Sequence, residues 1–228
     1  TGSSDRTREV AARFPNVKLA EFPWIDDFSA ARNVSLAHAT SDWVMWLDAD
    51  DRLDDENREK LRGLLASLPL PAMSDVSGRN ARPTGSQPLG YVMKVLCLPD
   101  ADGGYTAVDH VKLFPRHEQL RFEYRVHEQI LPALRQLGGD VCFTDIVIRH
   151  LGYQDKEQRE RKLERDRRIL EAELQERPDD PFCLFNLGCI AFEAGDYPAV
   201  CQLMRRSIDL SHPTDSTVRK CYAMLAHA

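Results

Sequence analysis

The sequence lacks three features that would assign it to a special class of protein. It holds no apolar run near the ~18 residues of a membrane span. Basic residues are not in excess, since 30 Lys and Arg face 36 Asp and Glu, which argues against general nucleic-acid binding. Its six cysteines form no Cys-x-x-Cys pair and no cluster with histidine. We therefore expect reduced cysteines in an ordinary globular protein with 43% hydrophobic and 29% charged residues.

Both ends of the sequence resemble cuts through structure. The chain begins at Thr1 without a methionine, and it ends inside a helical pattern at residues 225–228. Its opening loop leads into a helix, an arrangement that usually follows a strand in an α/β protein. We expect a fragment that lacks its first strand and is truncated at both ends.

The first 68 residues alternate between helical and extended patterns. Apolar spacing predicts helices at about 5–14, 26–37 and 54–68, and short apolar runs predict strands at 17–22 and 43–47. The run at 43–47 reads Trp-Val-Met-Trp-Leu without interruption. Such a run is typical of a strand buried on both faces of a parallel sheet.

A second group of strands is expected after a loop. Pro, Ser, Gly and Asn dominate residues 69–90, which predicts an exposed, mobile insertion. Beyond it, the patterns predict strands at 91–98, 105–114, 120–126 and 141–150, and a short helix at 128–137. Gly138 and Gly139 are expected to end that helix.

The pattern becomes entirely helical after residue 153. Residues 154–177 predict a long charged helix with a narrow apolar seam. Residues 179–212 resemble one tetratricopeptide repeat of about 34 residues, with Asn-Leu-Gly at 186–188 and Gly-Asp-Tyr at its turn, 195–197. A second repeat starts near Asp215. We expect a first domain at 1–153, a connecting helix at 154–178 and repeat-like helices at 179–228.

Two aspartates follow the apolar run at 43–47. Asp48 and Asp50 are two residues apart, so their side chains point the same way from an extended backbone. The carboxyl edge of an α/β sheet is where such proteins bind ligands. Paired carboxylates suit a hard cation, Mg²⁺ or Mn²⁺, which can bridge phosphate oxygens.

Other interpretations of this acidic segment remain. It can be an acidic turn that caps the next helix, a role suited to Asp51, Asp54 or Asp55. Phosphatases with an aspartate nucleophile also end a strand with such a pair. They need a small hydroxyl residue after the second aspartate, where this chain has Asp51, and so we disfavour that class.

An ordered set of motifs resembles the family 2 glycosyltransferases of the GT-A fold. Residues 27–33 read DFSAARN, Ala39 follows, and residues 42–51 read DWVMWLDADD. Residues 1–7, TGSSDRT, resemble the loop after the family's first aspartate-ending strand. The resemblance covers about residues 1–153, and the repeat resembles a bacterial subgroup that joins such a domain to tetratricopeptide repeats. It implies an α/β fold, a GT-A-like mixed sheet flanked by helices, followed by an all-α segment.

The resemblance also implies a donor, a metal and a set of binding residues. The donor is a nucleotide-diphospho-sugar, with UDP as the expected nucleotide, and the cofactor is Mn²⁺ or Mg²⁺. Asp50 resembles the direct metal ligand, and Asp48 a contact to the ribose or the metal. Arg32 and Asn33, together with Asp27, are expected to face the donor. A solvated Arg32 and a surface Asn33 are the alternative.

Catalytic residues are implied further along the chain. Glu128 resembles the general base, with His127 orienting it or binding a phosphate; a first-turn glutamate favoured by the helix dipole is the alternative. The Glu-Asp pair typical of many inverting members is absent, which leaves the identity of the base open. His150, after the last strand, is expected to complete the metal shell unless local hydrogen bonds satisfy it. His110 and His117 are expected to be structural or exposed.

Together these features imply a metal-dependent transferase that moves a sugar to an acceptor hydroxyl, with inversion. The acceptor class stays open between a glycan, a lipid-linked sugar and a protein. The alternative is a non-catalytic scaffold that binds partner proteins through its repeats. We expect no nucleic-acid partner and a cytoplasmic location, with peripheral attachment to the inner membrane left open. The 228-residue chain alone is expected to be inactive or weak because a strand that grips the nucleotide is missing.

Overall fold

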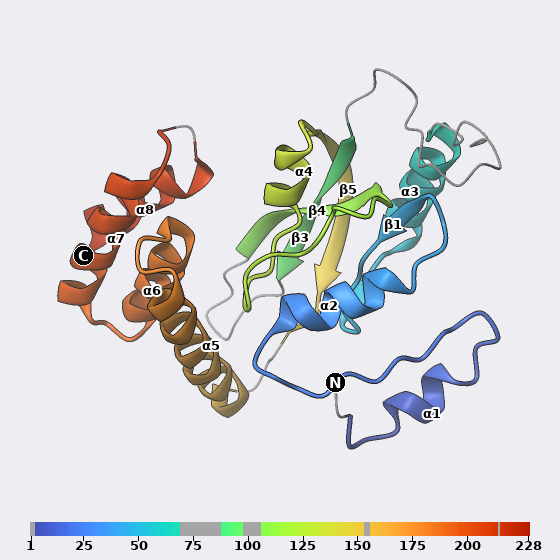
Figure 1. Ribbon diagram of the computed structural model, residues 1–228, viewed down its shortest axis with the longest axis horizontal. Helices are drawn as coiled ribbons and strands as arrows, with labels where there is room; N and C mark the ends of the chain where they lie inside the picture. The colour runs from blue at the N-terminus through green and yellow to red at the C-terminus, as the bar shows by residue number, and fades with distance from the viewer. Residues whose placement is uncertain (1–2, 69–87, 98–105, 153–155, 214) are drawn as a thin grey trace. The chain divides into compact units, whose positions relative to one another are not determined.

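A computed structural model of the chain describes residues 3–68, 88–97, 106–152, 156–213 and 215–228. The chain forms two compact units (Figure 1). The first comprises Thr1–Trp24, Ser29–Glu123 and Glu128–Gln154. The second comprises Ile25–Phe28, Tyr124–His127 and Asp155–Ala228. Among the described residues, no helix has the length and apolar character needed to cross a bilayer.

A mixed five-stranded sheet forms the centre of the first unit. Its strands are β1 (Trp43–Met45), β2 (Asp51–Arg52), β3 (Leu89–Cys97), β4 (Thr106–Pro115) and β5 (Asp140–His150). The order is β1-β4-β3-β5-β2, in which only β3 and β5 pair in parallel. Since β1 and β3 both run antiparallel to β4, the strands β1, β3 and β5 end at the same edge.

Helices cover both faces of this sheet. Alternation along β3 sends Val92 into one apolar cluster and Met93 into another. Helices α2 (Phe28–Ala37) and α4 (Leu131–Gln136) contribute to the first cluster, and α3 (Asp55–Ser67) packs on the second. Asp54 caps α3 by accepting from the backbone N–H of Asn57 at 3.0 Å, which confirms the predicted helix start. A short helix, α1 (Thr7–Ala11), precedes α2.

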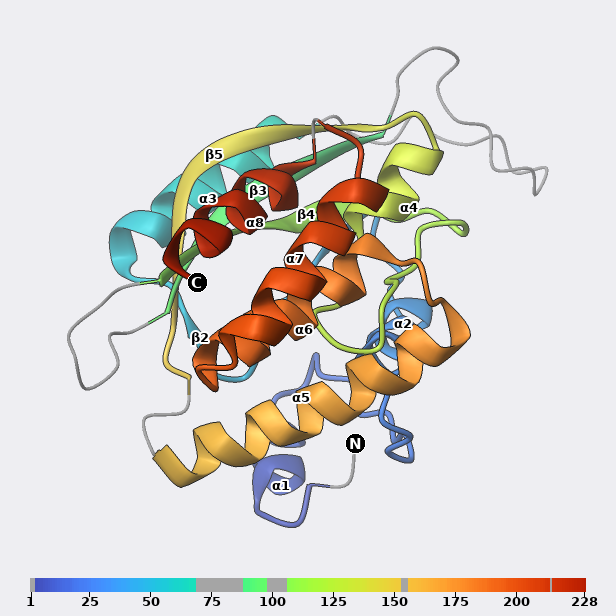
Figure 2. The same ribbon diagram turned by 90° about the vertical axis from the view of Figure 1, so that its left-hand side faces the viewer.

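Four helices form most of the second unit (Figure 2). They are α5 (Lys156–Glu176), α6 (Pro181–Glu193), α7 (Tyr197–Leu210) and α8 (Ser216–His227), each packed on the next. Gly195 adopts a left-handed φ of 72° at the turn between α6 and α7, as the repeat pattern predicts. Gly188 of α6 approaches Met204 of α7 closely enough that a Cβ would meet the methionine methyl at 2.5 Å. These landmarks confirm a helix pair of tetratricopeptide type.

One strand prediction is confirmed only in part, and two are wrong. Residues 43–47 form only a three-residue strand, half-buried and antiparallel to its neighbour, at the sheet edge of the described chain. Residues 17–22 pair with no described strand and form no ladder. Residues 120–126 form a loop with one bridge, from Glu123 to Gln129, because Tyr124 takes a left-handed φ of 71° that interrupts an extended chain.

One predicted helix begins later than expected, and two predicted segments cannot be compared with the structure. The short helix begins at Leu131, so Glu128 precedes it instead of lying in its first turn. Most of the predicted insertion, 69–87, lies outside the described residues, and so do residues 98–105, where the strand predicted at 91–98 ends and the one predicted at 105–114 begins.

Candidate metal and sugar-transfer site

The acidic segment crosses one end of the sheet. It leaves β1 at one edge and reaches β2 at the other, so Asp48 and Asp50 lie across the carboxyl ends of the strands. The backbone N–H of Leu151 donates to the Asp50 carbonyl at 3.1 Å, and Asp51 pairs in register with His150 of β5. The end of β5 therefore fixes the turn at the edge predicted to bind a ligand.

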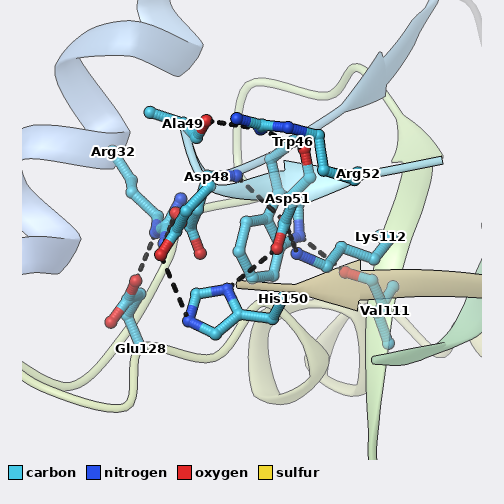
Figure 3. Close-up of polar contacts among 11 residues, drawn as sticks. Arg32, Trp46, Asp48, Ala49, Asp51, Arg52, Val111, Lys112, Glu128 and His150 are labelled. Carbon is cyan, nitrogen blue, oxygen red and sulfur yellow. Dashed lines mark hydrogen bonds and ion pairs between the residues drawn. The ribbon is translucent and has the colours of Figure 1, made fainter. Parts of the chain in front are cut away.

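Asp51 lies at the centre of a hydrogen-bond network (Figure 3). Its Oδ2 accepts from the backbone N–H of Asp48 at 3.0 Å and from Lys112 Nζ at 2.9 Å. Its Oδ1 lies 3.0 Å from His150 Nδ1. The side chain is only 1% exposed, so these partners replace the water that a carboxylate would otherwise bind.

Lys112 is a buried cation supplied by a bulge in β4. The register of the β3–β4 ladder passes over Lys112, and a bulge of this kind re-aims a side chain. The Lys112 side chain is 2% exposed, and its Nζ lies 3.5 Å from the centre of the Trp46 ring. Burial lowers the pKa of Lys112 despite the opposing effect of Asp51. The pKa of Asp51 is also lowered, because hydrogen bonds from Asp48 and Lys112 outweigh its burial.

Arg32 joins two further carboxylates. From α2, its Nη2 donates to Asp48 Oδ1 at 2.7 Å and its Nε donates to Glu128. The guanidinium carbon lies 4.2 Å from the centre of the Trp46 ring and 5.8 Å from that of Phe122. Burial disfavours the cation, but the two carboxylates prevail and raise the pKa of Arg32. The arrangement anchors Glu128 and Asp48 to one fixed cation.

Asp50 and His150 present atoms suited to a metal. Asp50 Oδ2 lies 3.5 Å from His150 Nε2, and the two side chains are 42% and 26% exposed. Asp48, Asp51 and His150 also bring one potential ligand atom each within 4.8 Å of one another. Oxygen and imidazole ligands of this kind suit Mn²⁺ or Mg²⁺. The chain therefore offers a possible cation site on this side of the turn.

The structure brings together some of the residues predicted from the sequence. Arg32, Asp48, Asp50, Glu128 and His150 form one cluster within the first unit.

The other predicted residues lie elsewhere or have other partners. The Asn33 side chain bonds both backbone groups of Phe122, at 2.9 and 2.8 Å, which holds the loop that leads toward Glu128. Asp27 and His127 belong to the second unit, and their predicted roles stay predictions.

Sequence reasoning missed two residues of this site. Asp51 was expected only as a helix cap, and Lys112 has no local motif because a bulge is not visible in the sequence. His110, which was expected to be structural or exposed, packs its ring edge-on to Trp46, with centroids 5.7 Å apart. Burial, helped by Lys112, lowers the pKa of His110 to about 4. The run of acidic residues after Trp46 was the one signal that could have identified Asp51.

Comparison with known proteins finds similarity to one family over part of the chain. Residues 1–72 match the model of glycosyl transferase family 2. A TPR repeat-containing protein of Synechococcus elongatus is 32% identical over the whole chain, which spans 52% of that protein. The SPbeta prophage-derived glycosyltransferase SunS of Bacillus subtilis is 25% identical over 82% of the chain and 40% of its own length.

The family match and the structure agree on the organisation of the chain. The chain spans about half the length of the curated relatives it matches, or less. Its first unit has the mixed sheet flanked by helices of a GT-A-like fold, and its second has successive packed helices. Residues 1–72 of the chain are thus similar to glycosyl transferase family 2, and helices of tetratricopeptide type follow further along the chain.

Proposed function

We propose that the chain is the sugar-transfer part of a bacterial, metal-dependent glycosyltransferase that uses a nucleotide-diphospho-sugar, with UDP as the first nucleotide to test. One observation carries the proposal. Asp50 and His150 converge to 3.5 Å beside the Arg32–Glu128 pair, in a chain whose start matches family 2 glycosyltransferases. The same cluster therefore contains groups that can bind a cation, Asp50 and His150, and a carboxylate that can accept a proton, Glu128.

The charge of the cluster supports a divalent ion. Two cations, Arg32 and Lys112, face four carboxylates, those of Asp48, Asp50, Asp51 and Glu128. Asp50 is the carboxylate that neither cation contacts in these bonds. Asp50 and His150 would hold Mn²⁺ or Mg²⁺, with Asp48 in reach of the metal or the ribose. A bound ion would offset the charge that develops on the leaving diphosphate.

Glu128 is the proposed base. In direct displacement, the acceptor oxygen bonds to the anomeric carbon while the bond from that carbon to the diphosphate oxygen breaks. The hydroxyl proton passes to Glu128, and the electron pair leaves with the nucleoside diphosphate. Arg32 fixes the Glu128 carboxylate from one side, which favours a single orientation toward the acceptor. This course inverts the anomeric centre.

We propose that the second unit binds a protein, either the acceptor of the sugar or another partner. Its helices have the form of tetratricopeptide repeats, and one relative carries TPR repeats in its name. A scaffold without catalysis remains the second candidate function on this observation. We place the protein in the cytoplasm.

Thermal unfolding tests the donor and metal assignments. The complete gene product is melted with a panel of nucleotide sugars, with and without Mn²⁺. A ligand at about 100 times its dissociation constant adds about 2.7 kcal/mol, a shift of several degrees. We expect a Mn²⁺-dependent shift with one UDP-sugar, and the same shift in Asp55→Asn, whose carboxylate is exposed on α3.

The variant Asp50→Asn should lose the Mn²⁺-dependent part of the shift. A folded protein that no nucleotide sugar stabilises would favour the scaffold. A normal Mn²⁺ response from Asp50→Asn would show that the metal ligand is assigned wrongly.

A further inference from the structure

Asp51 is the carboxylate of the cluster that is least available to a ligand. Three donors already occupy it: the Asp48 N–H, Lys112 Nζ and His150 Nδ1. Its side chain is 1% exposed, whereas that of Asp50 is 42% exposed. A carboxylate in this state acts on its neighbours, and a metal would reach it only by breaking bonds in a buried network.

The contact with Asp51 determines which nitrogen of His150 is free. An ionised carboxylate only accepts hydrogen bonds, and Asp51 Oδ1 lies 3.0 Å from Nδ1, within hydrogen-bond distance, whereas Asp50 Oδ2 is 3.5 Å from Nε2; this geometry favours the proton of the neutral ring on Nδ1. The lone pair is then on Nε2, the atom that lies 3.5 Å from Asp50 Oδ2. Free imidazole rings can hold the proton on either nitrogen, and here the carboxylate selects one.

Lys112 holds the Asp51 carboxylate in the orientation that this selection needs. It bonds Oδ2, the oxygen that also accepts from the Asp48 backbone, and this leaves Oδ1 directed at His150. The Trp46 ring, 3.5 Å from Nζ, limits the other positions open to the ammonium group. The bulge of β4 delivers this side chain to the site.

We infer that Asp51 and Lys112 are positioning residues, which fix His150 as the tautomer whose Nε2 faces Asp50. The inference rests on the proposed function only for the use of that nitrogen, because the tautomer itself is a property of the free protein. A carboxylate that accepts from a metal-binding histidine orients the imidazole ring. Loss of such a carboxylate commonly weakens metal binding by about 10- to 100-fold. In the alternative assignment, Asp51 is itself a ligand together with Asp48 and His150.

Nuclear magnetic resonance of the ring nitrogens decides the tautomer. The seven histidines of the chain are labelled with ¹⁵N, and His150 is assigned from its missing signals in His150→Gln. At alkaline pH, without metal, the parent should show a proton on Nδ1 and none on Nε2. This first measurement needs no change in the network. A proton on Nε2 in the parent overturns the inference.

Replacing the carboxylate by an amide should reverse the tautomer. In Asp51→Asn, the amide oxygen is needed by the Asp48 N–H and Lys112, so the NH₂ group faces Nδ1 and the proton moves to Nε2. Asp55→Asn on α3 is the control that should leave the His150 signals unchanged. An unchanged tautomer in folded Asp51→Asn also overturns the inference.

Titration with Mn²⁺ alone, monitored by the EPR signal of the free ion, tests whether Lys112, which cannot bind the metal as an ammonium group, still affects the metal affinity through its position. We expect the dissociation constant to rise at least about 10-fold in Lys112→Met. Lys112→Arg, which keeps the cation, should retain most of the affinity. The control is Lys94→Met, which removes a half-exposed Lys–Asp pair of β3 and β4. Parental affinity in folded Lys112→Met would overturn the role of Lys112.

The two proposals fail in different measurements. If Asp50→Asn binds Mn²⁺ as the parent does, or if the parent binds none, the proposed metal site fails. The tautomer of His150 is then still measured and still decides the positioning role.

Discussion

The half-buried histidine His110 beside the Trp46 ring makes the first unit sensitive to acid. The pKa of His110 is lowered to about 4 from 6.5, because burial and the nearby Lys112 outweigh the attraction of Glu128 and Asp48. In the unfolded chain the ring takes up its proton near the ordinary value. Between these two values the unfolded state binds more protons, so stability must fall as the pH falls.

The size of this effect follows from the two pKa values. From about pH 7.5 to about pH 5, one such histidine removes about 2 kcal/mol from the free energy of unfolding, and access of water to the half-buried ring makes this an upper value. Replacing His110 by Gln removes the titration. Acidification over this range should therefore lower the free energy of unfolding of His110→Gln by about 2 kcal/mol less than that of the parent. This difference does not depend on the stability of the variant at neutral pH.

Urea unfolding followed by tryptophan fluorescence measures this difference. The three tryptophans, Trp24, Trp43 and Trp46, all belong to the first unit, so their emission reports the unfolding of that unit. His38→Gln is the matched control, since His38 is exposed and lies just beyond the C-terminal end of α2. If the parent and His110→Gln lose the same free energy on acidification, His110 is not the half-buried neutral base described above.

Further predictions concern the bridging arginine and two glycines. Arg32→Lys keeps the charge but cannot bridge Asp48 and Glu128, so we expect kcat of the complete gene product to fall about 10- to 100-fold, whereas the exposed Arg58→Lys leaves kcat unchanged. In Gly188→Ala the new Cβ displaces the methyl end of the buried Met204, and the helical gain of alanine offsets part of this cost, so we expect a net loss of about 1 kcal/mol in the stability of the second unit, measured by thermal unfolding followed by circular dichroism. Gly63→Ala, with open space on α3, should instead stabilise the first unit by about 0.5–1 kcal/mol; a loss would refute the packing described for that helix.

The helices of both units could be predicted because their signals are local. Asp54 and Asn57 lie three residues apart and cap α3, and the pattern around Gly195 marks the turn of the repeat. Strand pairing depends on partners far along the chain, and it could not be predicted from the sequence. The run at 43–47 has the apolar composition of a central parallel strand, but its partner β4 is antiparallel and lies 70 residues further on in its register.

The residues of the candidate site also fall into those that could be predicted from the sequence and those that could not. Asp48 and Asp50 follow β1 and His150 ends β5, and the resemblance to a family pointed to all three. Lys112 stands inside a strand of mixed composition, and its role follows from a bulge in the ladder with β3. No spacing rule finds such a residue, since the bulge arises from the pairing of two whole strands.

Trp46 explains why these separate elements meet. Trp43 and Met45 pack into one apolar cluster, whereas Val44 and Trp46 pack into the other, as the alternation of an extended chain requires. Trp46 thus faces α2, and its ring lies 4.2 Å from the Arg32 guanidinium and 3.5 Å from Lys112 Nζ.

One indole therefore supports both cations of the site. Arg32 serves Asp48 and Glu128, and Lys112 serves Asp51 and through it His150. Contact with the aromatic face adds to the attraction of the carboxylates, and together they offset part of the hydration that the two cations lose on burial. The apolar segment and the acidic turn that follows it therefore contribute to the same site. The apolar segment supplies the Trp46 ring that contacts both cations, and the turn supplies the carboxylates that the cations orient.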